Sequence, residues 1–187
     1  MFVPPYICYT CYEVKRMKER KHHTISALLL MLYLIILTWL VLLKLGFNYQ
    51  ELVTGVHRLN LIPFKGTAII NGALDKKELL ANVAVFVPFG LLLSMNFSKM
   101  RFSSKWLLIF LTSFGYEAIQ YWLTIGGADI TDLINNTLGG FIGLVLYDIL
   151  ELIFRKKARL NAFLNICGVI LLIIFLGLAV MLYLGNK

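Results

Sequence analysis

Charge is the first thing that this sequence has little of. Only 15% of its 187 residues are charged, whereas soluble domains average roughly 25%, so the composition argues against an ordinary soluble domain. The sequence also contains no Gly-rich phosphate-binding loop, no HExxH motif and no nucleophile elbow. No internal repeat is evident. The sequence therefore offers no recognisable catalytic motif, and its function has to be argued from other features.

Long hydrophobic runs take the place of the missing charge. Hydrophobic residues make up 59% of the chain, and the mean hydropathy is +0.79. Runs of roughly 20 residues with almost no charge are long enough to cross about 30 Å of hydrocarbon as helices, which pair their own backbone polar groups in lipid. We therefore predict an all-α polytopic membrane protein, a bundle of about five transmembrane helices. The predicted spans are residues 25–45, 78–96, 105–125, 132–154 and 162–184.

The first apolar run is expected to remain in the protein as a membrane anchor. It is too long for the hydrophobic region of a signal peptide and lacks a small-residue cleavage site. We therefore divide the chain into a basic N-terminal tail, residues 1–24, and a transmembrane domain, residues 25–187.

The basic residues gather on one side of the predicted spans. A cytoplasmic N-terminus would put the tail and two of the connections inside, and these segments contain Lys15, Arg16, Lys18, Arg20, Lys21, Lys99, Arg101, Lys105, Arg155, Lys156, Lys157 and Arg159. This is the positive-inside distribution. The first outer loop, residues 46–77, weakens it with Arg58, Lys65, Lys76 and Lys77. We predict a cytoplasmic N-terminus and an extracellular C-terminus. The net charge of +8 then serves to orient the protein in the membrane and to attract anionic lipid headgroups, and it does not indicate binding to nucleic acid.

Polar side chains lie inside three of the predicted spans at similar depths. In the predicted topology, Glu117 lies about 12 Å and Asn136 about 6 Å below the outer boundary at 1.5 Å per residue, and Asn82 lies about one turn in. Helical spacing gives each span one stripe. The stripes are Glu78, Asn82, Phe86 and Phe89; Ser113, Glu117, Gln120 and Thr124; and Asp132, Asn136, Gly139 and Gly143. Because an ionised carboxylate costs roughly 2.5–3.5 kcal/mol at a helix centre, the stripes should face each other or a wet cavity open to the outside.

A purely structural interpretation stays open for several of these residues. Asn, Gln and Ser often hold helices together, and Gly139 and Gly143 have the small-xxx-small spacing that permits close helix contact. Asp132 can cap the fourth span, and Asp129 can serve the turn before it. For Glu117 we favour a functional role, because a neutral side chain would join helices at a lower desolvation cost.

Four blocks of the sequence resemble the successive signatures of the VanZ-like family. They are NLIPF (60–64), NVAVFVPFGLLL (82–93), YEAIQ (116–120) and DITDLINNTLGGFIG (129–143). The resemblance implies a small multi-span protein of the bacterial cell membrane. The family's namesake is an accessory glycopeptide-resistance protein associated with reduced teicoplanin sensitivity. The family pattern covers Asn60, Pro63, Phe64, Asn82, Phe86, Pro88, Gly90, Glu117, Gln120, Asp129, Asp132, Asn136, Gly139 and Gly143.

The sequence departs from the family pattern just before Asp129. Many members have an Arg shortly before this first Asp of the last block, whereas residues 125–129 here read IGGAD. If that Arg pairs with a carboxylate or binds an anionic group, this chain lacks it there. Arg58 and Lys65 in the outer loop are the candidates to replace it.

Two functions follow from the stripes and the resemblance. The first is an envelope protein that lowers sensitivity to teicoplanin-type lipoglycopeptides, because an outer-leaflet polar pocket binds an amphiphile or a lipid-linked cell-wall precursor. The predicted binding residues are Asn82, Glu117, Gln120, Asp129, Asp132 and Asn136. The second is a membrane-embedded hydrolase or transferase acting on a lipid-linked substrate, with Glu117 as acid or base and Asp132 as a further catalytic candidate. A proton-coupled transporter is a weaker third option, because five spans leave little room for paired repeats.

We expect no cofactor and no metal. Cys8 and Cys11, followed by His22 and His23, have the residue types of a metal site. Their irregular spacing instead favours a cytoplasmic tail with reduced thiols that are open to acylation. The expected partners are membrane lipids and, under the first function, a lipoglycopeptide or wall precursor; an oligomer is compatible with the sequence.

Overall fold

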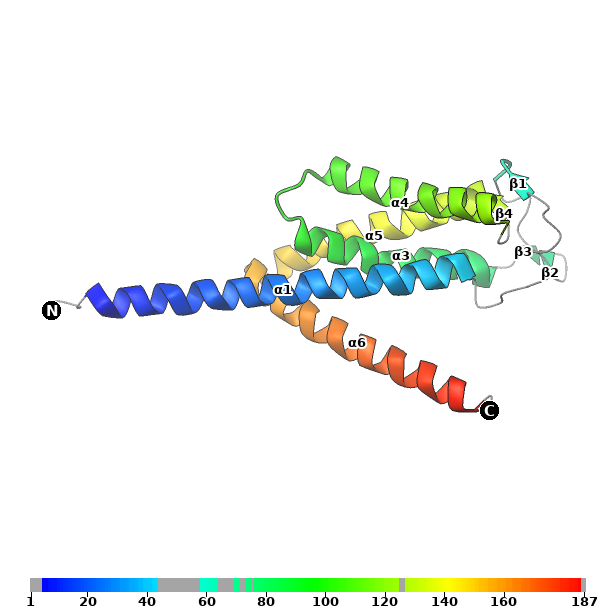
Figure 1. Ribbon diagram of the computed structural model, residues 1–187. Helices are drawn as coiled ribbons and strands as arrows, with labels where there is room; N and C mark the ends of the chain where they lie inside the picture. The colour runs from blue at the N-terminus through cyan, green and yellow to red at the C-terminus, as the bar shows by residue number, and fades with distance from the viewer. Residues whose placement is uncertain are drawn as a thin grey trace. The chain divides into compact units, whose positions relative to one another are not determined.

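The computed structural model describes residues 5–43, 58–63, 69–70, 73–74, 76–124 and 127–185. Within these ranges it contains five helices and four short strands (Figure 1). In chain order they are α1 (Pro5–Leu43), β1 (Arg58–Asn60), β2 (Ile69–Ile70), β3 (Ala73–Leu74), α3 (Lys76–Asn96), α4 (Phe102–Leu123), β4 (Gly127–Asp129), α5 (Ile130–Phe154) and α6 (Lys157–Gly185).

The chain divides into two compact units. The main unit, Leu30–Ile149, contains the C-terminal part of α1, all of α3 and α4, most of α5 and the strands. The second unit combines Met1–Leu29 with Leu150–Lys187. The predicted polar stripes all belong to the main unit.

The helical architecture confirms the predicted fold class. Four helical segments of the described chain are long and apolar enough to cross a membrane: His23–Leu42, Leu79–Asn96, Ile130–Phe154 and Lys157–Met181. The remaining helix, α4, has 22 residues, but Lys105, Glu117 and Gln120 dilute its apolar character. All three side chains are buried, so the outward face of α4 stays apolar.

Aromatic and aliphatic side chains fill the core of the main unit. Phe86 on α3 is fully buried, and its ring meets the Tyr116 ring of α4 edge-on at 6.4 Å between centroids and the Phe89 ring at 6.1 Å. Edge-on pairs are favoured because the positive ring edge meets the negative face. Leu37 of α1 and Ile109 of α4 belong to the same buried cluster. This core joins the helices that carry the polar stripes.

Glycines allow α3 and α5 to pack backbone against backbone. A Cβ atom added at Gly143 would meet the Val87 carbonyl oxygen and lie 3.0 Å from the Gly90 Cα. A Cβ at Gly139 would likewise meet the Val83 carbonyl oxygen. The close contact predicted from the small-xxx-small spacing is therefore confirmed, and it brings the polar groups of α3 and α5 within reach of each other.

Two short strands join segments that are far apart in the sequence. β1 pairs with β4 in parallel, with Arg58 opposite Gly127, Leu59 opposite Ala128 and Asn60 opposite Asp129. β2 and β3 form a separate antiparallel pair. None of these strands was predicted, because strands of two or three residues are too short to show an alternating pattern.

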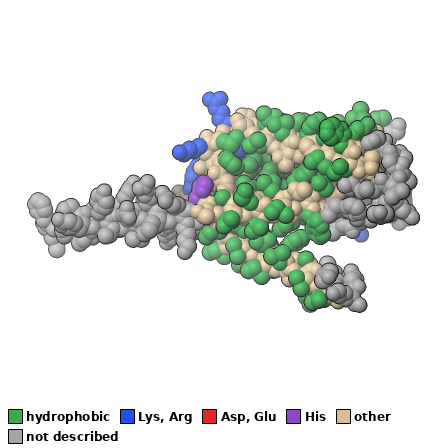
Figure 2. Space-filling model, viewed as in Figure 1, with side chains coloured by type: hydrophobic (Ala, Val, Ile, Leu, Met, Phe, Trp, Pro, Cys, Tyr) green, Lys and Arg blue, Asp and Glu red, His purple; other side chains and the backbone are tan. Residues whose placement is uncertain are grey.

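The second unit is built around α6. Lys157 forms an ion pair with Glu151 at 3.1 Å, Phe154 and Phe163 pack at 5.3 Å between ring centroids, and Leu29 of α1 lies 3.1 Å from where a Cβ at Gly168 would be. Most other α6 side chains are exposed and apolar. Large hydrophobic surfaces of this kind are unfavourable in water and suit a lipid environment, and hydrophobic side chains dominate the visible described face (Figure 2).

The predicted tail and the first predicted span belong to one helix, α1, which begins at Pro5. The side chains of Cys8, Cys11 and His22 lie outside the described part of the structure, as does Lys65 of the predicted outer loop. The alternatives raised for these residues therefore stay predictions.

Candidate functional site

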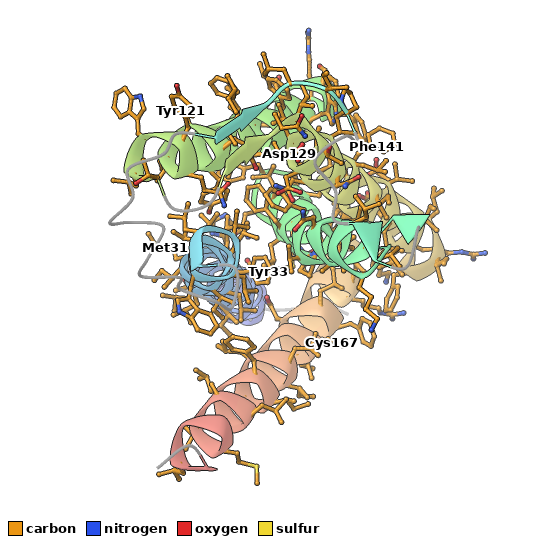
Figure 3. The ribbon with its side chains drawn as sticks, turned by 90° about the vertical axis from the view of Figure 1, so that its right-hand side faces the viewer. Met31, Tyr33, Tyr121, Asp129, Phe141 and Cys167 are labelled. Carbon is orange, nitrogen blue, oxygen red and sulfur yellow. The ribbon has the colours of Figure 1, made fainter. Side chains whose placement is uncertain are left out.

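Polar side chains from three helices meet where α3 begins, α4 ends and α5 begins. Asn82, Glu117 and Asn136 each lie six residues from that end of their helix, which is about 9 Å at 1.5 Å per residue. We call this end of the main unit the polar end. Figure 3 looks onto it and labels Asp129 among the helix ends. The polar cluster comprises Asn60, Asn82, Ser113, Glu117, Gln120, Asp129, Asp132, Asn135 and Asn136.

Glu117 joins α4 to the start of α5. The residue is only 6% exposed, and its Oε2 accepts the backbone N–H of Asp129 at 2.9 Å. A hydrogen bond to a charged acceptor contributes about 1.5–3 kcal/mol, which offsets part of the cost of burying the carboxylate. Glu117 is therefore a fixed acceptor that positions β4.

Asp129 connects three parts of the polar end. Its Oδ1 accepts the backbone N–H of Thr131 at 2.7 Å, and its Oδ2 accepts the side-chain amide of Asn60 at 3.0 Å. Because Asp129 immediately precedes α5, the bond to Thr131 is that of a helix N-cap. The sequence left open whether Asp132 caps this helix; Asp129 accepts the capping hydrogen bond, and Asp132 lies inside the first turn.

Asp132 and Asn82 tie α5 to α3. The Asn82 side-chain amide donates to Asp132 Oδ1 at 2.5 Å, and Asp132 is 6% exposed. On the other side of the unit, the Gln120 amide donates to the Val41 carbonyl of α1 at 2.9 Å. Together with the bond from the Asp129 N–H to Glu117, the Asn82–Asp132 bond brings the predicted binding residues of α3, α4 and α5 into one connected end of the bundle, and Gln120 adds a link to α1.

Several buried polar atoms of the cluster keep hydrogen-bonding capacity that the described protein atoms do not use. They are Ser113 Oγ, Gln120 Oε1, Asn135 Nδ2 and Asn136 Oδ1. Leaving such a group unsatisfied in the interior costs about 1–3 kcal/mol, so buried groups of this kind usually bond to water or a ligand. Three of the four atoms are oxygens, which suits a ligand rich in O–H and N–H donors.

Ser113 and Asn136 belong to the same layer of the bundle. One turn away, Ile109 of α4 lies against Gly140 of α5, because a Cβ at Gly140 would meet the Ile109 side chain. Moving one turn toward the polar end along both helices leads to Ser113 and Asn136. The hydrogen bond from the Asp129 N–H of β4 to Glu117 of α4 lies on the polar-end side of this layer. The unused oxygens of Ser113 and Asn136 thus lie about one helical turn beneath Glu117, whereas that of Gln120 lies on the other side of Glu117, toward the polar end.

Lys105 corrects one detail of the sequence prediction, which placed it in the basic connection before the third span. α4 begins at Phe102, so Lys105 lies inside the helix, where it is 7% exposed and donates to Ser94 Oγ at 3.3 Å. The spacing to Ile109 and Ser113 places it on the buried stripe. Extending the predicted stripe of Ser113, Glu117, Gln120 and Thr124 by two turns, through Ile109, would have revealed it from the sequence.

Other polar contacts support the site without having been predicted. The Tyr33 hydroxyl of α1 donates to the Val85 carbonyl of α3 at 2.5 Å, and Thr38 shares a 2.9 Å hydrogen bond with the Tyr116 hydroxyl. Thr124, the last residue of the predicted α4 stripe, lies just past the helix with φ 53° and is partly exposed. Among the described residues, no group of three His, Cys, Asp or Glu side chains is placed to hold a metal.

These features define a polytopic helical membrane protein with a buried polar cluster at one end of its main unit. The VanZ/LLP1 family model matches residues 30–154, which include the whole main unit. Protein VanZ of Enterococcus faecium is 40% identical over 149 residues, covering 79% of this chain and 88% of that protein. The chain therefore belongs to the VanZ/LLP1 family, and the resemblance found in the four sequence blocks is confirmed. No solved structure matches the chain.

Proposed function

We propose that the polar end binds the head of an amphiphile, either a teicoplanin-type lipoglycopeptide or a lipid-linked cell-wall precursor, and thereby lowers sensitivity to such drugs. The observation that carries this proposal is the set of unused buried oxygens on Ser113, Gln120 and Asn136. Sugar hydroxyls and peptide N–H groups are the donors that such oxygens accept. Both ligand classes present these donors next to a lipid chain.

The proposal places the polar end at the outer leaflet. Lys99 and Arg101 are exposed in the connection between α3 and α4, at the opposite end of those two helices. Basic connections of this kind face the cytoplasm under the positive-inside rule. An amphiphile in the outer leaflet would then meet Asn82, Asp132 and the layer beneath Glu117, and its acyl chain would lie along the apolar outer surface of the helices.

A membrane-embedded hydrolase or transferase is the second proposal, and the burial of Glu117 favours it. Glu117 is only 6% exposed within α4; an ionisable residue inside a membrane-spanning helix is a functional candidate by default, and a positioned carboxyl can transfer protons. The binding function is better supported, because the Glu117 carboxylate accepts the Asp129 N–H and so has a positioning role that needs no proton transfer.

Replacing Glu117 by Gln separates the two proposals. The amide keeps the size and an oxygen that accepts the Asp129 N–H, but it does not titrate. The variant and the wild type would be expressed at equal membrane levels in a teicoplanin-susceptible bacterium, and the inhibitory concentration would be measured. If the site only binds, the inhibitory concentration for the variant should lie within about twofold of that for wild type. If Glu117 transfers protons, the variant should lose the roughly 10²–10⁴-fold rate contribution of a catalytic acid or base, and protection should be lost with it.

A matched control uses Glu151, which forms an ion pair with Lys157 in the second unit. Glu151→Gln removes the same charge away from the polar end and should protect as wild type does. Full protection by Glu117→Gln would exclude the enzyme, whereas its collapse with unchanged membrane level and thermal stability would exclude binding by hydrogen bonds alone.

A further inference from the structure

An apolar groove of about 470 Å³ lies between the start of α4 and the middle of α5, away from the polar end. Its lining residues are Phe102, Ser103, Trp106, Thr137, Leu138 and Phe141. The Phe102 and Phe141 rings meet edge-on at 5.6 Å, so the wall is a packed aromatic surface. The volume falls within the roughly 300–1,000 Å³ of typical ligand sites.

The groove faces outward. Trp106 is 44% exposed and Leu138 is 48% exposed, and both lie on helices of a membrane protein. Apolar side chains exposed in this way contact hydrocarbon when the protein is in a bilayer. The chemistry of the groove therefore fits an acyl chain.

Positive charge stands at one end of the groove. Arg101 immediately precedes the lining residue Phe102, Lys99 lies two residues earlier, and both basic side chains are exposed. No ion pair or side-chain hydrogen bond ties either of them to another described residue. Lys105, one turn further along α4, donates a hydrogen bond to Ser94 and lies on the buried face.

One carboxylate opposes this charge. Asp148 follows Phe141 by seven residues on α5, which places it on the same helical face, and it is exposed. Two cations and one anion leave a net positive end beside an apolar groove. A zwitterionic headgroup gains little from such a site, whereas an anionic headgroup is attracted to it.

We propose that the groove between α4 and α5 binds a phospholipid with an anionic headgroup. One acyl chain occupies the groove against Trp106 and Phe141, and the phosphate lies near Lys99 and Arg101. This lipid site is independent of the ligand proposed for the polar end, because it lies at the other end of α4. It would make the protein sensitive to the anionic lipid content of the leaflet that holds the α3–α4 connection.

Trp106 provides a direct probe of this site. The full-length chain has three tryptophans, so Trp39→Phe with Trp122→Phe leaves Trp106 as the sole fluorophore. The protein would be placed in phosphatidylcholine nanodiscs containing increasing fractions of brominated-chain phosphatidylglycerol or brominated-chain phosphatidylcholine, which quench tryptophan on contact. Each basic residue near a membrane surface raises the affinity for anionic lipid about fivefold, and Asp148 offsets one of the two basic residues. Half-maximal quenching should therefore need about fivefold less brominated phosphatidylglycerol than brominated phosphatidylcholine.

Charge variants and a second tryptophan complete the test. Lys99→Gln with Arg101→Gln leaves Asp148 unopposed and should abolish or reverse the preference for the anionic lipid, and Asp148→Asn should increase that preference. A protein with Trp122 as the sole tryptophan is the matched control, because Trp122 is 83% exposed near the far end of α4 and should be quenched equally by both lipids. Equal quenching of Trp106 by both lipids would overturn the proposal in favour of bulk lipid. No quenching by either lipid would overturn it in favour of a second protein copy covering the groove.

Discussion

The side-chain amide of Asn82 on α3 donates a hydrogen bond to the carboxylate of Asp132 on α5. The two residues are 50 positions apart in the sequence, and both lie within the first two turns of their helices. The bond is made beside the glycine contact that lets the two helices approach closely. It fixes the side of the polar cluster that α3 and α5 share.

This bond predicts a rescue by exchange. Asn82→Asp should destabilise the protein by about 1–3 kcal/mol, because two carboxylates would then face each other. Combining it with Asp132→Asn restores one amide and one carboxylate and should recover more than half of the loss. Thermal unfolding of the four proteins in detergent gives the coupling energy; strictly additive effects would contradict the bond.

The glycine contact predicts a difference between two alanine substitutions. Gly143→Ala should lower stability by about 1–3 kcal/mol, because its Cβ would meet the Val87 carbonyl oxygen. Gly115→Ala on α4 is the matched control, since a Cβ there meets nothing within 4 Å. That control should be neutral or stabilising by up to about 1 kcal/mol, because alanine favours helix over glycine. Equal melting temperatures for the two variants would show that α3 and α5 do not pack at this site.

The capping role of Asp129 predicts a local effect on α5. Asp129→Ala should cost about 1 kcal/mol and accelerate amide exchange at Thr131, whose N–H the carboxylate accepts. Asp129→Asn keeps an oxygen acceptor, so the Thr131 amide of this variant should exchange at the wild-type rate. Hydrogen–deuterium exchange read by mass spectrometry distinguishes the outcomes, and equal acceleration in both variants would assign the protection to the charge, not to the cap.

The proposed orientation predicts one-sided labelling. In a background with the native cysteines replaced by serine, Thr124→Cys at the polar end should react with a membrane-impermeant maleimide on intact cells. Ser98→Cys in the α3–α4 connection is exposed in the structure but should react only after the membrane is permeabilised. The reverse pattern would invert the topology and place the polar cluster at the cytoplasmic leaflet.

The sequence predicted the helices and the buried stripes because both depend on periodic patterns. Ser113, Glu117 and Gln120 repeat at helical spacing, and all three are buried. The pairing of β1 with β4 had no such signal, because it joins short segments that are distant in the sequence. Predicting that Asp129 caps α5 would have required the exact residue at which α5 begins. Sequence patterns locate a helix boundary only within a few residues.

Lys105 shows how charge alone can mislead. A lysine beside Lys99 and Arg101 reads as part of a basic connection, yet its side chain lies inward and bonds to Ser94. The helical phase set by Ile109 and Ser113 outweighs the preference of an ammonium for water, because a long side chain can reach an acceptor on the neighbouring helix. The same helical periodicity explains why Glu117, one turn after Ser113, lies inside the bundle.

The most direct test of the account is a titration of a teicoplanin-type lipoglycopeptide into the nanodisc-embedded protein, comparing wild type with Asn136→Leu. Removing the buried amide, whose Oδ1 has no partner among the described residues, should not lower the stability of the ligand-free protein. If the ligand uses that oxygen, affinity should fall about tenfold, equivalent to roughly 1.4 kcal/mol. Thr112→Ala, which changes a residue bonded only within its own helix, should bind as wild type does. Unchanged affinity in Asn136→Leu would contradict the assignment of the polar cluster as the binding site.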